Sequence, residues 1–251
     1  MQIRNKSVWP SGGLNLESLM ETLFYRDEFL SIASHELKTP LTSIKLQAEV
    51  FKRLAKRDDA EIYSKERVDR LVNLVDTQTN RLIVLVEDML DISRIRSGQF
   101  HMTKQRVNVS EIVQEAVFKV KQVEAVNINL KVGSEYFILG DRDRILQVFG
   151  ILLKNGARYG RGLPLQVELV RRKSKILFSV KDLGSGIEKE DKRKIFHRFQ
   201  RGVPASEVSG LGLGLYIARE IVQAHSGKIS VSSKINLGST FKVEFNVQEV
   251  L

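Results

Sequence analysis

Two long stretches in the first hundred residues repeat apolar side chains at the spacing of an α-helix. In the first, from residue 14 to 57, apolar positions recur every three or four residues. They form one narrow stripe: Leu30, Ala33, Leu37, Leu41, Ile44, Ala48, Phe51 and Ala55. Asp58 and Asp59 indicate a turn, and a second helical pattern covers 64–97. The segment 1–13, which contains proline and glycine, is predicted to be a flexible lead-in.

The second helix carries more apolar surface than one partner helix can cover. Part of that surface alternates steps of four and three residues, the heptad spacing of a helical bundle. These positions are Val68, Val72, Val75, Thr79, Leu82, Val86 and Met89. Leu71, Leu85 and Ile92 widen the stripe further. The pattern therefore predicts a helical hairpin that dimerises into a four-helix bundle.

After Gly98 the chain changes from long helices to short runs rich in Val, Ile and Phe. Strands are predicted at 128–132, 136–139, 165–171, 175–181, 228–233 and 240–246, and helices at 110–124, 142–158 and 212–225. Mixed strands and helices favour a two-layer α/β sandwich. The sequence thus predicts an α+β multidomain protein with a flexible segment 1–13, a helical-hairpin domain 14–99 and an α/β domain 100–251.

Composition narrows the function classes. The chain has 251 residues, of which 42% are hydrophobic, as in ordinary globular proteins. It has no cysteine, which excludes disulfides and thiolate metal sites and is compatible with the cytoplasm. No apolar run is long enough to span a bilayer, and the first residues lack the apolar core of a signal peptide. The net charge is +10, but Lys and Arg are scattered among acidic residues, so we expect no nucleic-acid partner.

His35 is the most informative residue of the first helix. It lies roughly 160° from the centre of the apolar stripe, so it faces outward, and Thr39 shares that face one turn later. Glu36 is adjacent, and Pro40 removes a backbone donor and crowds the carbonyl of Glu36, which predicts a locally bent or loosened helix. An outward histidine on a rigid helix suits attack on a group brought from outside. A single such histidine is, however, more often an ordinary solvated side chain.

The second half contains four segments that suit a nucleotide. They are 147–159, with Asn155, Arg158 and Tyr159; 180–187, with Asp182, Gly184 and Gly186; 194–202, with Phe196, Arg198 and Phe199; and a glycine run with Gly210, Gly212 and Gly214 that opens a helix. Glycines let the backbone approach a ligand closely, and helix N-termini attract phosphate. Each segment alone is also compatible with an ordinary helix or turn. No Walker-type phosphate loop occurs.

Together these segments resemble a known family. His35-Glu-Leu-Lys-Thr-Pro40 resembles the phospho-acceptor box of the sensor histidine kinases of two-component signalling. The four later segments, in the same order, resemble the Bergerat-type ATP-binding domain that these kinases share with gyrase, Hsp90 and mismatch-repair ATPases. Gly238-Ser-Thr-Phe241, which includes Thr240, resembles the end of that domain. The resemblance covers about residues 20 to 247.

The resemblance implies the following roles. ATP and magnesium are the cofactors, Asn155 ligates magnesium, and Arg158 and Tyr159 flank the phosphates and the base. The carboxylate of Asp182 accepts a hydrogen bond from the adenine amine, and the glycines and Thr240 surround the nucleotide. Phe196 and Phe199 pack the base of a lid, and either Arg198 or Arg201 reaches the γ-phosphate.

For the phospho-acceptor helix, the resemblance implies attack by His35 on ATP in a homodimer and transfer to an aspartate of a response-regulator receiver domain. Glu36 stabilises the charge on the imidazole, and Thr39 positions water for a phosphatase reaction. Thr39 could instead donate a hydrogen bond back to the helix carbonyl near Pro40. The expected location is the cytoplasm, either free-standing or as the cytoplasmic part of a longer membrane-bound sensor.

One residue departs from the family pattern. Four positions before Asn155, where the family usually has a polar residue, this chain has Ile151. A hydrocarbon there cannot activate water, which argues against an ATPase of the gyrase type. It also keeps open an alternative function, a catalytically weak dimeric adaptor that binds a receiver domain.

Overall fold

The structure, a computed structural model, describes residues 16–56, 64–200 and 211–247, with side chains from residue 30 onward. The chain divides into two compact units, Met1–Gln78 and Thr79–Leu251, and each is described by itself. The division falls within the second long helix. The boundaries drawn from the sequence at 13 and 99 stay predictions.

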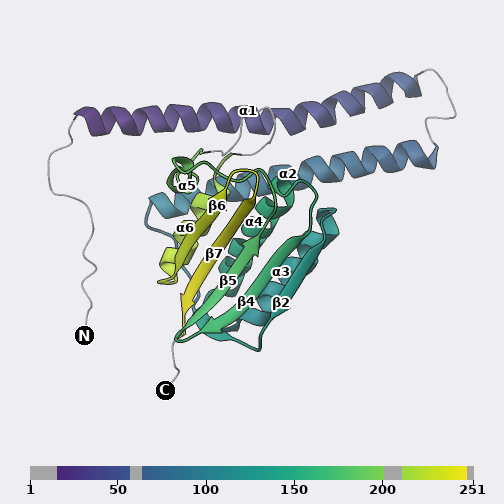
Figure 1. Cartoon of the computed structure of the whole chain (residues 1–251). Helices are drawn as coiled ribbons and strands as arrows, with labels where there is room; N and C mark the ends of the chain where they lie inside the picture. The colour runs from purple at the N-terminus through teal and green to yellow at the C-terminus, as the bar shows by residue number, and fades with distance from the viewer. Residues whose placement is uncertain (1–15, 57–63, 201–210, 248–251) are drawn as a thin grey trace. The chain divides into compact units, whose positions relative to one another are not determined.

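Two long helices contain most of the described residues before residue 100, as predicted. Helix α1 covers Leu16–Ala55 and continues through Pro40, and helix α2 covers Lys65–Arg96 (Figure 1). Helix α2 ends in a Schellman motif, because the Gly98 N–H donates to the carbonyl of Ile95 and the Gln99 N–H to that of Arg94. Gly98 has the positive φ of 68° that this motif requires.

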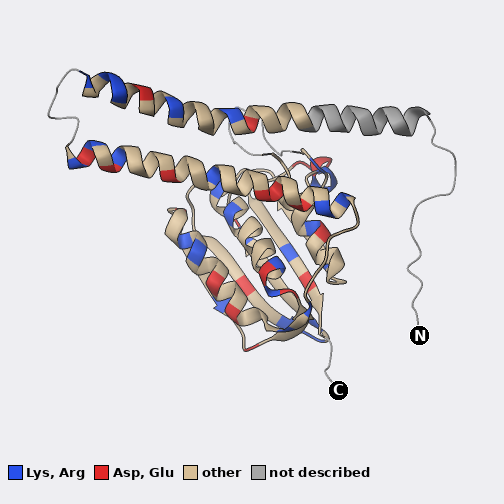
Figure 2. Ribbon diagram, turned by 180° about the vertical axis from the view of Figure 1, so that it is seen from behind, with Lys and Arg blue, Asp and Glu red and all other residues tan. Residues whose placement is uncertain are grey.

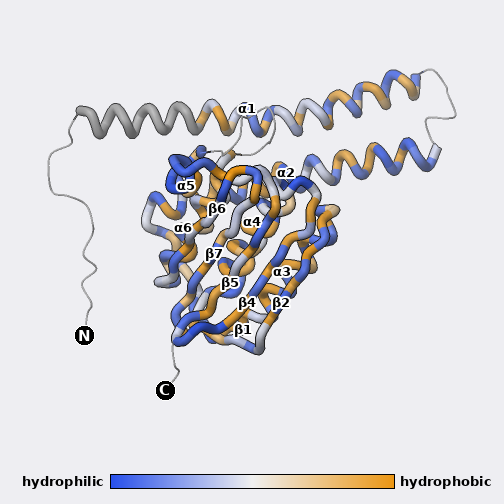
Figure 3. The backbone as a smooth tube through the Cα atoms, in the orientation of Figure 1, coloured by the Kyte–Doolittle hydropathy of each residue, from blue (hydrophilic) through white to orange (hydrophobic). Residues whose placement is uncertain are grey.

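Apolar positions recur between polar ones along both helices (Figure 3). In the first unit Val68, Val72 and Val75 of the predicted heptad are exposed in this single chain, as is Leu41 of the α1 stripe. In the second unit the added positions Leu85 and Ile92 are buried, whereas Val86 of the heptad is 46% exposed. The heptad positions named here are therefore available to a further partner.

The described residues after α2 form two sheets and three main helices. The helices are α3 (Val109–Val123), α4 (Arg142–Tyr159) and α6 (Gly214–Ala224). The five-stranded sheet has the order β2 (Ile128–Val132), β4 (Leu165–Arg172), β5 (Lys175–Lys181), β7 (Gly238–Asn246), β6 (Lys228–Lys234), with β2 and β4 parallel and the other neighbours antiparallel. A small antiparallel pair joins β1 (Gln105–Asn108) to β3 (Phe137–Gly140).

The three helices lie on one face of the five-stranded sheet, and the other face is open (Figures 1 and 2). The rings of Phe149 on α4 and Phe178 on β5 stack with centroids 4.0 Å apart, and both side chains are fully buried. The predicted α/β sandwich is therefore confirmed. Two short elements were not predicted: strand β1, which has one apolar residue, and the four-residue charged helix α5 (Asp191–Lys194).

Candidate functional site

His35 is exposed on α1, as the helical pattern predicts, and its neighbour Glu36 is buried. The hydroxyl of Thr39 donates a hydrogen bond to the backbone carbonyl of His35 at 3.0 Å. This contact is the alternative weighed for Thr39 above, and the hydroxyl can leave it by rotation about one bond. The roles of these three side chains in catalysis stay predictions.

Asp182 is the best-defined polar group of the second unit. It follows β5 directly and is only 3% exposed. Its Oδ1 accepts two backbone N–H bonds, from Gly184 at 2.9 Å and from Ser239 at 3.1 Å. Its own N–H donates to the carbonyl of Ser239 at 2.9 Å. The carboxyl group is therefore fixed in one orientation by the backbone on both sides.

The second carboxylate oxygen of Asp182, Oδ2, is not engaged by the two backbone N–H groups that hold Oδ1. Oδ2 accepts no hydrogen bond from the part of the chain that the structure describes, where no fully buried side-chain oxygen or nitrogen lacks a partner. Oδ2 must then reach accessible space. Burial raises the pKa of Asp182, and the N–H bonds from Gly184 and Ser239 oppose that shift. The group offers an acceptor to a donor brought from outside.

Two of the predicted glycines have no room for a side chain. A Cβ on Gly184 would lie 1.9 Å from the backbone oxygen of Tyr159, so the loop after Asp182 packs directly on the end of α4. Gly186 has a φ of +76°, and a Cβ there would lie 2.3 Å from the oxygen of Lys234. Gly184 thus lets Tyr159 and Asp182, two predicted nucleotide residues, approach each other, and Gly186 lets the same loop pack on the end of β6.

Ser239, the neighbour of the predicted nucleotide residue Thr240, lies against Asp182. Thr240 pairs in register with Lys181, which is exposed, and so its side chain belongs to the open face of the sheet. Ser239 is buried and meets Asp182 through its backbone N–H and C=O. Strand alternation could have indicated this, because Phe241, Val243 and Phe245 are the covered positions of β7, and Ser239 shares their parity.

The remaining predicted residues of α4 share one stripe. At 100° per residue, Ile151, Asn155 and Arg158 lie within a narrow sector of the helix surface. Asn155 is half-buried, and its side-chain amide makes no hydrogen bond within the described residues. Arg158 is exposed and Tyr159 half-buried. An amide oxygen in this setting is a ligand suited to a hard cation.

The segment around Phe196 packs beside the start of α6. Phe196 is buried edge-to-face against Phe241, with ring centroids 6.4 Å apart, and the half-buried Phe199 has a φ of +61°. The guanidinium of Arg198 lies over the ring of Tyr216, 5.4 Å from its centroid. This cation–π contact does not by itself direct Arg198 toward a phosphate.

The glycine run is described only in part, because Gly210 lies outside the described residues. Gly212 has a φ of +67°, and a Cβ on it would lie 3.0 Å from the oxygen of Gln200. Gly214 is the first residue of α6, and a Cβ there would lie 3.3 Å from Cγ2 of Ile151. The start of α6 therefore packs on the same α4 stripe that carries Asn155.

Comparison with known proteins agrees with this arrangement. Residues 25–98 match the His Kinase A (phospho-acceptor) domain, and residues 140–249 match the family of histidine kinase-, DNA gyrase B- and HSP90-like ATPases. The chain belongs to the sensor histidine kinases. The resemblance drawn from the sequence is thereby confirmed, and the matched ranges contain His35 and Asp182 respectively.

Individual relatives carry the same family name. The chain is 35% identical to the sensor-like histidine kinase SenX3 of Mycobacterium tuberculosis over 223 residues, which is 86% of this chain and 52% of that protein. It is 30% identical to the sensor histidine kinase WalK of Bacillus subtilis over 86% of this chain and 36% of WalK. The chain thus spans about half or less of the length of these two relatives.

A solved structure supports the fold. The histidine kinase AdeS of Acinetobacter baumannii superposes with a TM-score of 0.61 at 22% identity, over 86% of this chain and 98% of that structure. Among the described residues, no helix of this sensor histidine kinase is long and apolar enough to cross a membrane.

Proposed function

We propose that this chain is an ATP-dependent protein-histidine kinase that phosphorylates itself on His35 and passes the phosphoryl group to an aspartate of a response-regulator receiver domain. The observation that carries the proposal is the geometry of Asp182. Its Oδ1 is held by two backbone N–H groups while Oδ2 faces accessible space. This arrangement suits an adenine, whose exocyclic amine donates to a fixed acceptor, and not a guanine, whose oxo group would face the carboxylate.

Asn155 would hold magnesium in this site. Magnesium takes oxygen ligands and is commonly bound by one or two protein oxygens together with substrate phosphates. The described residues contain no cluster of three or more His, Asp or Glu side chains, so a site built mainly of carboxylates does not occur among them. When bound, the cation would offset charge on the phosphates. The half-buried amide of Asn155 fits this requirement.

The chemical step proposed for His35 is in-line attack on the γ-phosphorus of ATP. A lone pair of the neutral imidazole forms the N–P bond, the bond from phosphorus to the β–γ bridging oxygen breaks, and ADP leaves. Positive charge then develops on the ring. Glu36, which is adjacent and buried, would stabilise that charge once the helix relaxes near Pro40, because a buried carboxylate interacts more strongly than a solvated one.

The enzyme would act as a homodimer. Val68, Val72 and Val75 form an exposed apolar row on α2 at heptad spacing, and Leu41 adds to the exposed apolar surface of α1. A second hairpin would remove this surface from water and complete a four-helix bundle. Because the reaction consumes ATP, we place the chain in the cytoplasm, either alone or as part of a longer sensor.

The test is the mass of the intact protein after incubation with magnesium ATP. We expect one added phosphoryl group that is labile in acid and stable in alkali, as phosphohistidine is. His35→Gln should remove it, whereas His101→Gln, a change at another exposed histidine, should not. Equal labelling of the parent and His35→Gln would refute the assignment.

Ile151 supports a second candidate, a weakly catalytic adaptor. Its side chain packs against the first residue of α6, Gly214, with 3.3 Å between Cγ2 and the place of a Cβ. The stripe that carries Asn155 is therefore apolar at this point. An adaptor would dimerise and bind a receiver domain but show no label in the intact-mass experiment.

A further inference from the structure

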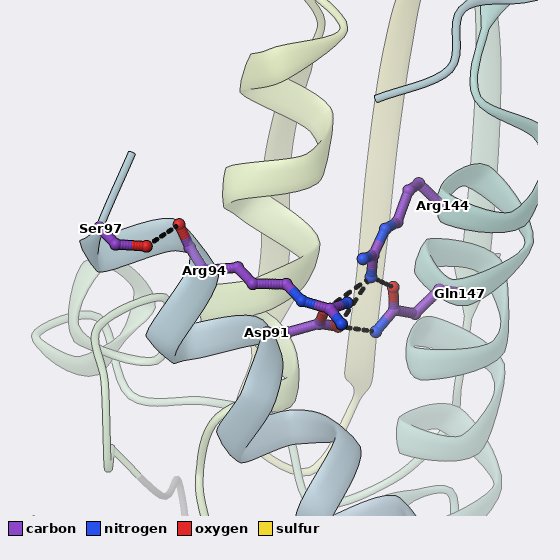
Figure 4. Close-up of polar contacts among 5 residues, drawn as sticks. All are labelled: Asp91, Arg94, Ser97, Arg144 and Gln147. Atoms are coloured by element: carbon purple, nitrogen blue, oxygen red, sulfur yellow. Dashed lines mark hydrogen bonds and ion pairs between the residues drawn. The ribbon is translucent and has the colours of Figure 1, made fainter. Parts of the chain in front are cut away.

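Asp91, in the last turns of α2, is buried among side chains of α4 (Figure 4). Arg144 donates from Nη1 to both carboxylate oxygens at 2.8 Å, and Gln147 donates from Nε2 to Oδ2 at 2.7 Å. Arg144 also donates to Oε1 of Gln147 at 2.9 Å, and the exposed Arg94 of α2 lies at the edge of the group, with its Nη1 4.0 Å from Oδ1 of Asp91. We call Asp91, Arg144 and Gln147 the Asp91 cluster. It lies within the unit Thr79–Leu251.

The cluster is shielded from water. The side chain of Asp91 is 5% exposed and that of Arg144 is 19% exposed. The guanidinium of Arg144 also lies 4.7 Å from the ring centroid of Phe100, in the connection that follows α2. A buried ion pair with complete hydrogen bonds adds little net stability, but breaking it leaves a charge without a partner. Such a pair favours one arrangement of α2 and α4 over its alternatives.

The cluster occupies one end of the α4 stripe that carries Asn155 at the other. Arg144, Gln147, Ile151, Asn155 and Arg158 all lie within about 40° of one line along the helix. Asn155 follows Gln147 by about 12 Å of helix rise. Because a helix moves as a rigid rod over this length, a contact that fixes Gln147 also fixes the position of Asn155 relative to α2.

The covalent link alone would hold the nucleotide-binding domain loosely. Only residues 97–104 connect α2 to β1, and they contain no helix or strand. Thr103 and Lys104, at its end, donate hydrogen bonds to Asp141 and Ala224, so without the cluster, residues 97–102 are the part of the connection that would permit a range of orientations. Helix α2 itself is continuous from Lys65 to Arg96, and its first half belongs to the unit that contains His35. We therefore expect a contact that holds the domain on α2 to affect how often bound ATP meets the phospho-acceptor helix.

We infer that Asp91, Arg144 and Gln147 are positioning residues for phosphoryl transfer: they dock the nucleotide-binding domain on α2 and set the rate at which His35 is phosphorylated, without contacting ATP. This inference rests on the proposed function. A residue that contacts ATP would change both the affinity for ATP and the rate of autophosphorylation. The Asp91 cluster should change only the rate, because it affects how bound ATP is presented to His35.

The test uses the full chain and the variants Asp91→Asn, Arg144→Gln and the double variant. At saturating magnesium ATP, we expect the autophosphorylation rate of each single variant to fall by roughly tenfold. The double variant should fall no further than the slower single variant, since both changes remove one interaction. The dissociation constant for ATP should stay within twofold of the parent's, and amide hydrogen exchange over 97–104 should rise.

The matched control is Arg142→Gln, at the same end of α4. Arg142 lies on the opposite side of the helix and pairs with Glu115 of α3, so the rate, the ATP affinity and the exchange should not change. Should Asp91→Asn not fold, Gln147→Met removes one hydrogen bond at nearly constant volume and should slow labelling by a few fold.

Three results would overturn the inference: an unchanged rate in the cluster variants, a raised rate, or a parallel loss of ATP affinity. A raised rate would mean that the contact restrains the domain, and a loss of ATP affinity would mean that the contact only supports the structure of the nucleotide site. A parent that carries no label on His35 would instead contradict the proposed function itself. A labelled parent with unchanged variants removes only the positioning role.

Discussion

Replacing Asp182 by Asn tests the nucleotide site at the level of one hydrogen bond. In the parent, Oδ1 accepts from Gly184 at 2.9 Å and from Ser239 at 3.1 Å. An asparagine can keep both bonds only if its amide oxygen takes the place of Oδ1, because an NH₂ group cannot accept them. The NH₂ then replaces Oδ2 and presents a donor to the adenine amine, which is also a donor.

The free-energy cost of this donor–donor mismatch can be estimated. Leaving a buried polar group unsatisfied costs about 1–3 kcal/mol. Such a cost corresponds to a weakening of ATP binding by about 5- to 150-fold. The same substitution should favour GTP relative to ATP, because the guanine oxo group accepts from the new NH₂. We therefore expect the ratio of the two affinities to shift, as well as ATP binding to weaken.

The assay is a titration of the parent and Asp182→Asn with ATP and with GTP, each in the presence of magnesium. Asp143→Asn is the control, since the side chain of Asp143 is 90% exposed at the other end of α4 and its change should leave both affinities intact. Thermal unfolding of each variant checks that the fold survives. Equal affinity of the parent for ATP and GTP, or an unchanged ATP/GTP ratio in a folded Asp182→Asn, would refute the reasoning.

Three further predictions concern Gly184, Asp88 and Thr39. Gly184→Ala should weaken ATP binding at least tenfold, because the new Cβ would lie 1.9 Å from the backbone oxygen of Tyr159. The control is Gly150→Ala in α4, where the space around the glycine is open; this change should raise the free energy of unfolding by about 0.5–1 kcal/mol. Burial raises the pKa of Asp88 from 3.8 to about 7, so the native state holds a proton that the unfolded state releases, and stability falls as pH rises across that interval. Asp88→Asn should therefore raise the melting temperature relative to the parent at pH 8 but not at pH 4. The rise should be about 2–4 °C for each kcal/mol gained in the free energy of unfolding. An equal rise at both pH values would contradict this. Thr39→Ala should leave autophosphorylation within about twofold of the parent while slowing dephosphorylation of a phosphorylated receiver domain, and equal changes in both rates would mean that its hydroxyl only caps the helix carbonyl.

Local patterns were sufficient for most of the secondary structure. The strands predicted at 128–132 and 175–181 match β2 and β5, and the two long helices end within about two residues of their predicted limits. These elements carry their apolar periodicity within themselves. Strand β1 does not, because its four residues include only one buried apolar side chain. Its partner strand β3 is also distant in sequence: the nearest register pair, Asn108 and Phe137, is 29 residues apart.

The site was harder to predict wherever an assignment depended on which strand face a residue occupies. Asp182 and Gly184 pack beside Tyr159 at the end of α4, and their roles in binding a nucleotide stay predictions. Thr240 was chosen from a motif, whereas the parity of β7 places Ser239 on the covered face beside Asp182. A motif specifies residue types and spacing, but the period of two along the strand decides which of two adjacent hydroxyl residues faces the helices.

Buried carboxylates are the feature that local patterns could not reveal. In the described part of the chain, the acidic residues with the lowest exposure, 6% or less, are Glu36, Asp91 and Asp182, whereas Asp88 is only partly buried. Carboxylates are almost never buried unless other groups compensate their charge, because desolvation disfavours the ionised form. Asp91 reads in sequence as one more charged position on an amphipathic helix, and its partner Arg144 is 53 residues away. Where a chain departs from hydrophobic-in, polar-out patterning, the departure commonly marks function. Glu36 lies beside the proposed phospho-acceptor, Asp182 at the proposed adenine contact, and Asp91 between α2 and α4. The burial of Asp91 therefore points to a functional role, as does the burial of the other two carboxylates.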